Sequence, residues 1–376
     1  MNFNAKPDDI PLPLGVRSRV INNGNGLDMH ILEAGFEEPH RPCVLLLHGF
    51  PELAYSWRNV LPVLAAAGYH VVAPDQRGYG QTYGWDDAAE GGVHSYRIFN
   101  LMLDCLGLIM ALGRSSVAAV VGHDFGSFVA AICALTRPDV FQSVVLMSAP
   151  FDGVSAASRI PDPIHAQLSR LNPARKHYQW YLSTAKANAD LDECPQGIHD
   201  FLRAYFHHKS ADWGSNPPHP LQSWTATELA GMPRYYIMDL DQDMPATVAE
   251  HMPTGDQIKS CSWLTEQQLR VYSQAFERCG FQKPLNWYRS KTANTDNAEL
   301  LAYAGRSIDV PACYIAGASD WGSYQKPGAL ETMQASACSD FRGVHFIEGA
   351  GHWVQQEQAQ EVNRVLLAFL QTHCQN

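Results

Sequence analysis

The stretch that decides the fold reads Val117-Ala118-Ala119-Val120-Val121, followed by Gly122-His123-Asp124-Phe125-Gly126. The first five residues are all apolar, which is typical of a strand buried on both faces in a parallel sheet. A helical pattern follows over residues 126–136. Glycines on both sides of the turn suit a bend too tight for side chains. The stretch therefore predicts a sharp strand–turn–helix unit that exposes Asp124, although an aspartate here could also be only a helix N-cap.

Other short apolar runs are separated by segments of helix length, such as residues 99–112. The runs predicted as further strands are residues 44–47, 70–73, 144–147, 312–316 and 344–347. Residues 16–34 read as a hairpin, because an Asn-Gly-Asn-Gly turn precedes alternating apolar residues. We therefore expect an α/β fold with a mostly parallel sheet flanked by helices on both faces.

The pattern changes between residues 151 and 299, where no buried-strand run occurs. Ile198, Phe201 and Tyr205 have helical spacing, and Thr265 with Gln268 resembles a capping box. A last amphipathic helix is expected over residues 355–370. We therefore predict a core domain made of residues 1–150 and 300–376, with residues 151–299 inserted as a helical cap.

Composition limits the class of protein. The chain has 376 residues, 46% hydrophobic and 17% charged, with a formal net charge of −11, so it is a globular protein rather than a disordered one. The negative charge argues against nucleic acid or an anionic membrane as a partner. No run approaches the ~18 apolar residues of a membrane span, and the first nine residues lack a signal-peptide pattern. We therefore expect a cytoplasmic protein. Composition does not decide its oligomeric state.

Cysteines and histidines give no sign of a disulfide framework or a metal centre. The nine cysteines include no C-x-x-C pair, and Cys105, Cys133 and Cys313 lie in apolar segments typical of buried free thiols. Sixteen histidines are present, but none has the spacing of a metal motif. We expect no metal and no organic cofactor.

Two later strands also end in polar residues. The run at 312–316 leads into Gly317-Ala318-Ser319-Asp320, and the run at 344–347 leads into a glycine-rich loop that contains His352. Loops at the carboxyl ends of parallel strands share one crevice. The order of Asp124, Asp320 and His352 is that of the nucleophile, acid and histidine of the α/β-hydrolase triad.

The run at 44–47 leads into His48-Gly49-Phe50-Pro51. In α/β-hydrolases this loop contributes a backbone N–H to the oxyanion hole, and the residue after the nucleophile contributes the other. The expected donors are therefore the N–H groups of Phe50 and Phe125. We expect His48 to order the loop, since His352 already occupies the triad position.

An aspartate nucleophile favours attack on a saturated carbon, because attack on a carbonyl would give a labile anhydride. The resulting alkyl–enzyme ester would then be hydrolysed. Dehalogenation and epoxide opening both fit this scheme and differ in the leaving group. A halide needs only N–H donors, whereas an epoxide oxygen leaves as a strongly basic alkoxide and needs a proton.

These motifs resemble those of epoxide hydrolases with the α/β-hydrolase fold. The resemblance covers nearly the whole chain after about residue 15. The segments that carry it are residues 48–58, 75–80, the Gly-His-Asp-x-Gly turn, His177-Tyr178-Gln179-Trp180-Tyr181 and Asn286-Trp287-Tyr288-Arg289. The first three are shared with dehalogenases, whereas the last two look specific to epoxide hydrolases. The resemblance implies that Tyr178 and Tyr288 protonate the epoxide oxygen, with Tyr181 as the alternative to Tyr178.

Aromatic residues of the cap predict a pocket for a small apolar epoxide and water. The side chains assigned to this pocket are Pro51, Trp180, Trp287 and Trp353. Many of the cap aromatics could equally be cap core.

Two alternatives remain. A haloalkane or haloacid dehalogenase would use the same triad, but Phe125 lacks the indole N–H or guanidinium that such relatives carry after the nucleophile. A non-catalytic receptor or scaffold of the same fold is also conceivable. It is the weaker alternative, because every triad position holds a competent residue.

Overall fold

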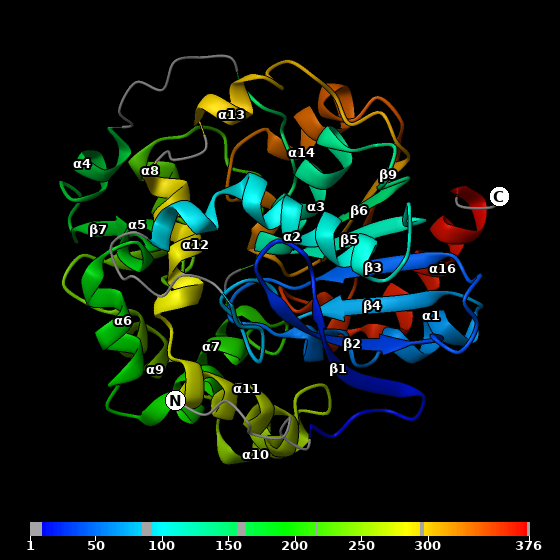
Figure 1. The fold of residues 1–376 in the computed structure, drawn as a ribbon. Coiled ribbons are helices and arrows are strands. Elements are labelled where there is room, and N and C mark those ends of the chain that lie inside the picture. The colour runs from blue at the N-terminus through cyan, green and yellow to red at the C-terminus, as the bar shows by residue number, and fades with distance from the viewer. Residues whose placement is uncertain (1–9, 85–91, 156–162, 216, 294–296, 374–376) are drawn as a thin grey trace.

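The computed structural model describes residues 10–84, 92–155, 163–215, 217–293 and 297–373 (Figure 1). The first nine residues, on which the expectation about a signal peptide rested, lie outside these ranges. Within the described ranges, no helix is both long enough and apolar enough to cross a bilayer.

A mostly parallel sheet carries the predicted strands. They are β1 (Val16–Asn22), β2 (Asp28–Ala34), β3 (Cys43–Leu47), β4 (His70–Pro74), β5 (Ala119–His123), β6 (Val144–Met147), β9 (Ala312–Gly317) and β10 (Phe341–Ile347). The spatial order is β1-β2-β4-β3-β5-β6-β9-β10. β1 and β2 form the predicted hairpin, and β2 pairs antiparallel with β4, whereas the pairs from β4 to β10 are parallel. The predicted fold class is confirmed.

One predicted strand is displaced. The apolar run at residues 117–121 suggested a strand that ends before Gly122, but β5 begins at Ala119 and includes both Gly122 and His123. These two residues pair with Leu146 and Met147 of β6, so the ladder continues through a buried histidine. Because Gly122 and His123 are not apolar, the hydrophobic pattern did not indicate that the strand continues through them. As a result, the strand leads directly into Asp124.

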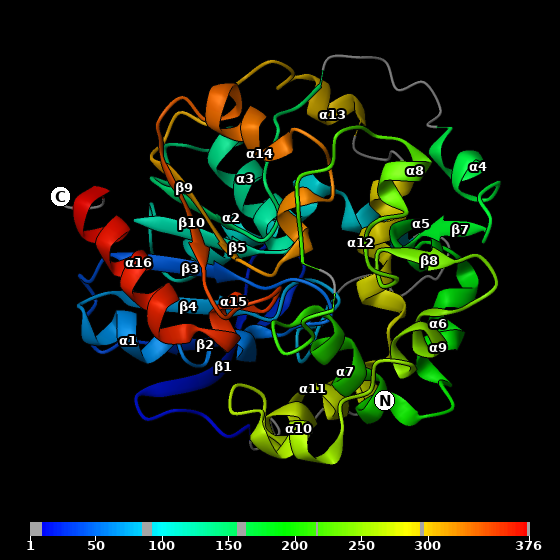
Figure 2. The same cartoon turned by 180° about the vertical axis from the view of Figure 1, so that it is seen from behind.

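Helices cover both faces of the sheet (Figures 1 and 2). α2 (Ile98–Ala111) and α3 (Phe125–Thr136) lie on one face, and α1 (Leu61–Ala66) and α16 (Ala359–His373) lie on the other. The predicted helix at 355–370 is interrupted, because α15 (Val354–Glu357) ends at Gln358, whose φ of −130° and ψ of 53° are not helical. The short helices α13 (Asn297–Leu301) and α14 (Ala329–Thr332) flank β9 in sequence.

The chain between β6 and β9 forms a cap beyond the carboxyl ends of the parallel strands (Figure 1). Its helices are α4 (Ile164–Leu168), α5 (Tyr178–Leu182), α6 (Ala185–Asp192), α7 (Gly197–Lys209), α8 (Ala226–Leu229), α9 (Met244–Ala249), α10 (Gly255–Ser260), α11 (Glu266–Cys279) and α12 (Gln282–Thr292). The capping box predicted at Thr265 and Gln268 is present at the start of α11. The domain boundaries at residues 151 and 299 stay a prediction.

The predicted helical cap also contains one small sheet. β7 (Arg175–His177) and β8 (Ile237–Asp239) pair antiparallel within the cap. Each strand has only three residues, too few to show the two-residue alternation by which a strand is recognised in sequence. This small sheet matters for the site, because Tyr178 immediately follows β7.

Candidate active site

Asp124 occupies the turn between β5 and α3. Its backbone has φ 52° and ψ −118°, a region that residues with a side chain rarely adopt and that stores strain. Gly122 permits the turn, because a Cβ at this position would lie 2.1 Å from the carbonyl oxygen of Gly126. Within the described chain, the Asp124 side chain makes no capping hydrogen bond to α3. The strained turn therefore presents the carboxylate to the site instead of using it to cap the helix.

Asp124, Asp320 and His352 meet as the sequence predicted. His352 Nδ1 donates to Asp320 Oδ1 at 3.0 Å, and His352 Nε2 lies 3.3 Å from Asp124 Oδ2. Asp320 Oδ1 also accepts the N–H of Gly322 at 2.7 Å. The imidazole is thus held between two carboxylates, with its free nitrogen facing Asp124.

Both carboxylates of this group are held in the ionised form. Burial by itself raises the pKa of Asp124, but attraction to His352, Lys209 and His123 outweighs burial and lowers that pKa below its usual value. The pKa of Asp320 is also lowered, because His352 and the N–H of Gly322 outweigh the effect of burial. At neutral pH, Asp124 is a carboxylate, the form that can act as a nucleophile.

The loop after β3 contacts the same carboxylate. The N–H of Phe50 donates to Asp124 Oδ1 at 3.1 Å. The N–H of Phe125 belongs to the first turn of α3, where helix geometry leaves N–H groups without intrahelical partners. His48 Nε2 accepts the N–H of Gln76 at 3.1 Å, and its Nδ1 lies 2.9 Å from the carbonyl oxygen of Gly49. These contacts fit the loop-ordering role expected for His48.

A buried ion pair lies directly behind the triad. His123 Nδ1 contacts Glu52 Oε2 at 2.6 Å, and His123 Nε2 contacts the backbone oxygen of His352 at 2.7 Å. Both partners can only accept hydrogen bonds, so both ring nitrogens of His123 must carry a proton. His123 is therefore an imidazolium. It links the strand before the nucleophile to the loop that carries His352.

Glu52 supplies the counter-charge for this imidazolium. Burial raises the pKa of Glu52, yet His123 and the N–H of Gly49 bring it down to about 2. Burial lowers the pKa of His123, but Glu52 more than reverses that and raises it above the usual value. Glu52 Oε1 also accepts the side-chain amides of Gln355 and Gln356, at 2.9 and 3.0 Å. The Glu52 carboxylate thus links the loop after β3, the end of β5 and helix α15 to one another.

Glu52→Gln is expected to destabilise the fold by about 3–5 kcal/mol, because it leaves the buried His123 imidazolium without its counter-charge. The Glu52 pKa lies below its unfolded value, so its contribution is complete above about pH 4.5 and is lost as the pH falls through about 2. The His123 pKa is raised, so its contribution is complete below about pH 6.5 and is lost as the pH rises through the folded value. The deficit should therefore be largest between about pH 4.5 and 6.5.

Urea unfolding of wild type and variant across this range measures the deficit. Glu33→Gln is a matched control, because Glu33 is also buried but two of its partners, Arg17 and Arg19, are guanidinium groups rather than imidazoles. The loss in free energy of unfolding caused by Glu33→Gln should persist above about pH 6.5, where the loss caused by Glu52→Gln becomes smaller. Equal stability of wild type and Glu52→Gln near pH 5.5 would contradict this account.

The two predicted tyrosines come together near Asp124. Tyr178 begins α5 and Tyr288 lies in α12, and their ring centres are 6.1 Å apart. The ring of Tyr288 lies 5.5 Å from that of Phe50 and 5.6 Å from that of Phe125. Both rings are buried, which raises the pKa of each phenol above its usual value, and the nearby Asp124 charge adds to this rise.

The hydroxyl groups of these tyrosines differ. The Tyr178 hydroxyl donates to Gln325 Oε1 and accepts from Gln179 Nε2, both at 3.1 Å. The Tyr288 hydroxyl has no hydrogen-bond partner in the described part of the chain. Tyr181, the alternative to Tyr178, donates to Asp190 at 2.9 Å within the cap. Geometry thus favours Tyr178 over Tyr181.

The residues assigned to the substrate pocket have different surroundings. Trp287 packs edge-on to Phe125, with ring centres 4.9 Å apart, and its indole N–H donates to the carbonyl of Arg77. Trp353 is fully buried against His352 and Phe206. Trp180 is half-buried and lies against His165 and His177. Pro51 is buried and joined to Phe50 by a cis peptide.

Sequence reasoning gave no role to four residues at this site. Glu52 and His123 lie within motifs that were recognised, but a motif does not show that their side chains pair. Gln325 lies 147 residues from Tyr178 in sequence, and no pattern marks it. The fourth residue, Lys209, ends a cap helix and is buried near the triad, where the charges of Asp124 and Asp320 oppose the lowering of its pKa by burial.

Comparison with known proteins identifies the family and the fold. A family model described as alpha/beta hydrolase fold matches residues 42–359. The chain is 34% identical to epoxide hydrolase A of Mycobacterium tuberculosis, covering 95% of this chain and 98% of that protein. An epoxide hydrolase from an endophytic Streptomyces superposes with a TM-score of 0.78 at 33% identity, covering 96% of each chain. Epoxide hydrolase A from Mycobacterium thermoresistibile superposes with a TM-score of 0.71 at 34% identity, covering 95% of this chain and 98% of that one.

Relatives of this identity, matched over nearly the full length of both chains, establish the family. They also argue against the alternative of a non-catalytic receptor or scaffold. The triad order, the strained aspartate turn and the paired cap tyrosines had each pointed the same way before the comparison. The chain belongs to the epoxide hydrolases of the α/β-hydrolase fold.

Proposed function

We propose that this enzyme converts a small apolar epoxide and water into a vicinal diol through a covalent ester on Asp124. The observation that carries the proposal is that two buried phenols, Tyr178 and Tyr288, lie together and near enough to the ionised Asp124 for its charge to raise their pKa values. A nucleophile with proton donors close to it suits the opening of a strained C–O bond.

In the first half-reaction, one oxygen of Asp124 attacks a ring carbon of the epoxide, and the bond between that carbon and the ring oxygen breaks. The electron pair remains on the oxygen, which takes a proton from Tyr178 or Tyr288. The product is a hydroxyalkyl ester of Asp124 and a phenolate. Strain in the Asp124 backbone helps to hold the carboxylate in position for attack.

The raised pKa values of the tyrosines support this assignment. Burial and the charge of Asp124 hold both phenols in the neutral form at neutral pH. Such a phenol gives its proton only to a strongly basic oxygen, and an opening epoxide develops one. A departing halide is too weak a base to take this proton.

In the second half-reaction, His352 removes a proton from water, and the resulting hydroxide attacks the ester carbonyl. Asp320 holds the imidazole through Nδ1 at 3.0 Å. The tetrahedral oxyanion is bound by the N–H groups of Phe50 and Phe125. Its collapse breaks the bond between the carbonyl carbon and the alkyl oxygen, which leaves in the diol. His352 gives the proton that it took from water to the departing alkoxide, and the carboxylic acid left on Asp124 gives its proton to the phenolate.

Dehalogenation receives less support from the same residues. The Phe125 side chain has no donor for a halide. The indole N–H of Trp287, whose ring packs against that of Phe125, already donates to the carbonyl of Arg77 at 2.9 Å. A halide would therefore find no free indole donor from either residue.

Diol formation from styrene-type, aliphatic and internal epoxides tests the proposal, with chromatographic detection of the diol. Wild type should form diol from at least one class, and Asp124→Ala should form none above the uncatalysed rate. The matched control Asp152→Ala removes a carboxylate that pairs with Lys326 at the edge of the cap and should keep turnover. Halide release from haloalkanes, with no diol from any epoxide, would contradict the proposal.

A further inference from the structure

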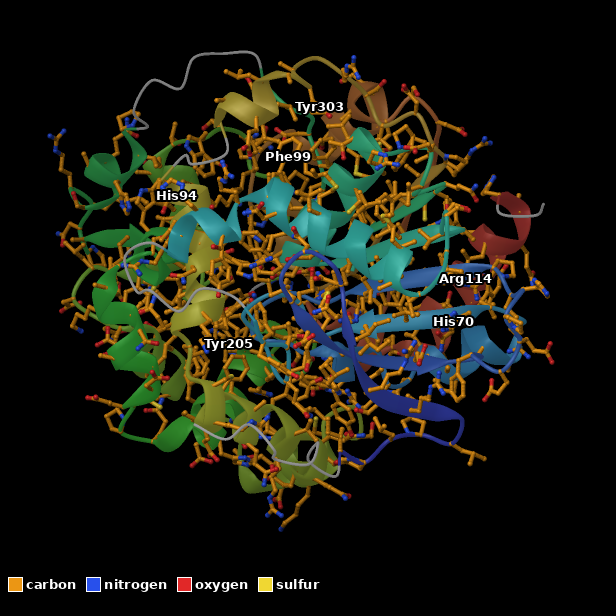
Figure 3. All side chains as sticks on the ribbon, in the orientation of Figure 1. His70, His94, Phe99, Arg114, Tyr205 and Tyr303 are labelled. Carbon is orange, nitrogen blue, oxygen red and sulfur yellow. The ribbon has the colours of Figure 1, made fainter. Side chains whose placement is uncertain are left out.

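A cavity lined by arginines lies at the end of the sheet opposite the active site. Its volume is about 560 Å³, within the range of small-molecule sites, and it opens to solvent. We call it the arginine cavity, because four arginines from three segments of the chain line it: Arg17, Arg19, Arg41 and Arg114. Figure 3 shows Arg114 beside His70 and far from Tyr205 in the cap.

The arginine cavity lies at the amino ends of the parallel strands. Cys43 and His70, the first residues of β3 and β4, line it, as does Ala118 immediately before β5. Asp124 follows the other end of β5, whose five residues span about 16 Å at about 3.3 Å per residue. A ligand in the arginine cavity therefore does not touch the triad.

Two of the four guanidinium groups have no counter-ion. Within the described chain, neither Arg41 nor Arg114 contacts a carboxylate. Arg41 Nη1 donates to the carbonyl of Ala65 at 3.0 Å, and Arg114 Nη1 donates to the carbonyl of Arg41 at 2.8 Å. Arg114 Nη2 donates to His70 Nδ1 at 3.1 Å, since a guanidinium can only donate. These partners fix the positions of both cations without neutralising them.

The other two arginines share one carboxylate. Arg17 Nη2 and Arg19 Nε lie 2.8 and 2.5 Å from the same oxygen, Oε1 of Glu33. Oε2 accepts a hydrogen bond from His70 Nε2 at 2.8 Å. Burial raises the pKa of Glu33, but His70 and the two arginines outweigh burial and lower it to about 2. Glu33 is therefore ionised, and both of its oxygens are engaged by these three partners.

The arginine cavity has a surplus of positive charge. Among the described residues that line it, Glu33 is the only acid, so one carboxylate faces four guanidinium groups. Glu37 and Glu38, in the loop between β2 and β3, are exposed and do not line it. Protonation of His40, which is also in the lining, would only increase the surplus. The chain as a whole has a net charge of −11, so a concave surface of the opposite sign favours an anionic ligand.

Uncharged polar groups lie next to these arginines. Ser115 and Ser116 directly follow Arg114 and line the same cavity, as does Gln142. In the part of the chain that the structure describes, the side chains of these three residues make no hydrogen bond. A phosphate group has about two negative charges at neutral pH and three oxygens that accept hydrogen bonds, whereas a carboxylate has one charge and two oxygens. The charge surplus and the additional donors therefore favour phosphate.

We propose that the arginine cavity binds a small organic phosphate, with Arg41 and Arg114 as the residues that hold the phosphate group. A guanidinium presents paired N–H donors that match two oxygens of a phosphate at once. Phe36, whose ring stacks on the Arg17 guanidinium at 3.5 Å, adds an apolar surface for the organic part. The proposal is independent of the epoxide chemistry, because the arginine cavity contains no residue of the active site.

Isothermal titration calorimetry at low ionic strength tests this inference, with phenyl phosphate and inorganic phosphate as separate probes. Wild type should bind phenyl phosphate at one site per chain. R41Q and R114Q should each bind it at least tenfold more weakly, because each loses hydrogen bonds to a charged group. R270Q is a matched control, since Arg270 is exposed on α11 and has no carboxylate partner in the described chain. Its affinity should equal that of wild type.

Three results would overturn the inference. They are no binding of phenyl phosphate by wild type, equal affinity of R41Q and wild type, and inorganic phosphate binding as tightly as phenyl phosphate. The last would mean that the cavity recognises only the free ion. If R114Q does not fold, R41Q carries the test, because the Arg41 side chain makes a single hydrogen bond in the described chain. Diol formation should be equal in R41Q and wild type, so a failure here is distinct from a failure of the proposed function.

Discussion

His352→Gln is expected to trap the enzyme as a covalent ester with its substrate. Asp124 keeps its contact with the N–H of Phe50, and the first half-reaction does not use the imidazole as a base. The second half-reaction loses its general base, which is worth about 10²–10⁴ in rate. Alkylation should continue while hydrolysis nearly stops. Intact-protein mass spectrometry should show an increase of one substrate mass.

Two comparisons make this result specific. The double variant Asp124→Ala/His352→Gln should show no adduct, because the attacking oxygen is gone. His345→Gln changes a half-buried histidine in β10 outside the site, and it should turn over like wild type. If the single variant gains no mass with any epoxide that wild type consumes, the covalent scheme is wrong.

The double variant Tyr178→Phe/Tyr288→Phe should lose nearly all alkylation, by about 10³-fold, because no phenol remains to protonate the epoxide oxygen. The rings that pack on Phe50 and on each other are kept. Stopped-flow measurement of alkylation, followed through intrinsic fluorescence, gives the rate. Each single variant should lose less, since the other phenol still donates.

The two single variants should differ in stability. Tyr178→Phe removes hydrogen bonds to Gln325 and Gln179, each worth about 1 kcal/mol. Tyr288→Phe removes no hydrogen bond within the described chain and should unfold like wild type. Tyr181→Phe is the control for activity, because that hydroxyl is engaged by Asp190 within the cap. A double variant within tenfold of the wild-type alkylation rate would rule out the tyrosines as the acid.

The turn at Asp124 and the triad could be predicted because each triad residue follows a strand. The tight turn also limits which side chains fit, and that limit is visible in neighbouring residues of the sequence. Gly122 and Gly126 indicate the tight turn, because a side chain at either position would clash with backbone. Asp124, Asp320 and His352 follow strands whose carboxyl ends lie at the same edge of the sheet, so they could be expected to meet. The fold class and the family were therefore accessible from sequence, and the comparisons confirm both. The catalytic roles of these residues stay predictions.

What could not be predicted depends on contacts between distant segments. The pairing of Glu52 with His123 requires the loop after β3 to face the end of β5. The arginine cavity combines side chains from β1, from the loop after β2 and from the segment after α2. Neither a motif nor a periodicity in the sequence predicts contacts between segments so far apart. The same holds for the end of β5, because a buried histidine extends a strand that apolarity alone would have ended earlier.

The most direct test of the covalent mechanism is a single turnover in water enriched in oxygen-18, with enzyme in excess over epoxide. The account predicts that the first diol carries no label, because its new oxygen comes from the carboxylate of Asp124. The label should instead enter Asp124, and mass spectrometry of the peptide that contains it should show an increase of about two mass units. A labelled diol in the first turnover, with unlabelled Asp124, would mean that water attacks the epoxide directly and would contradict the account.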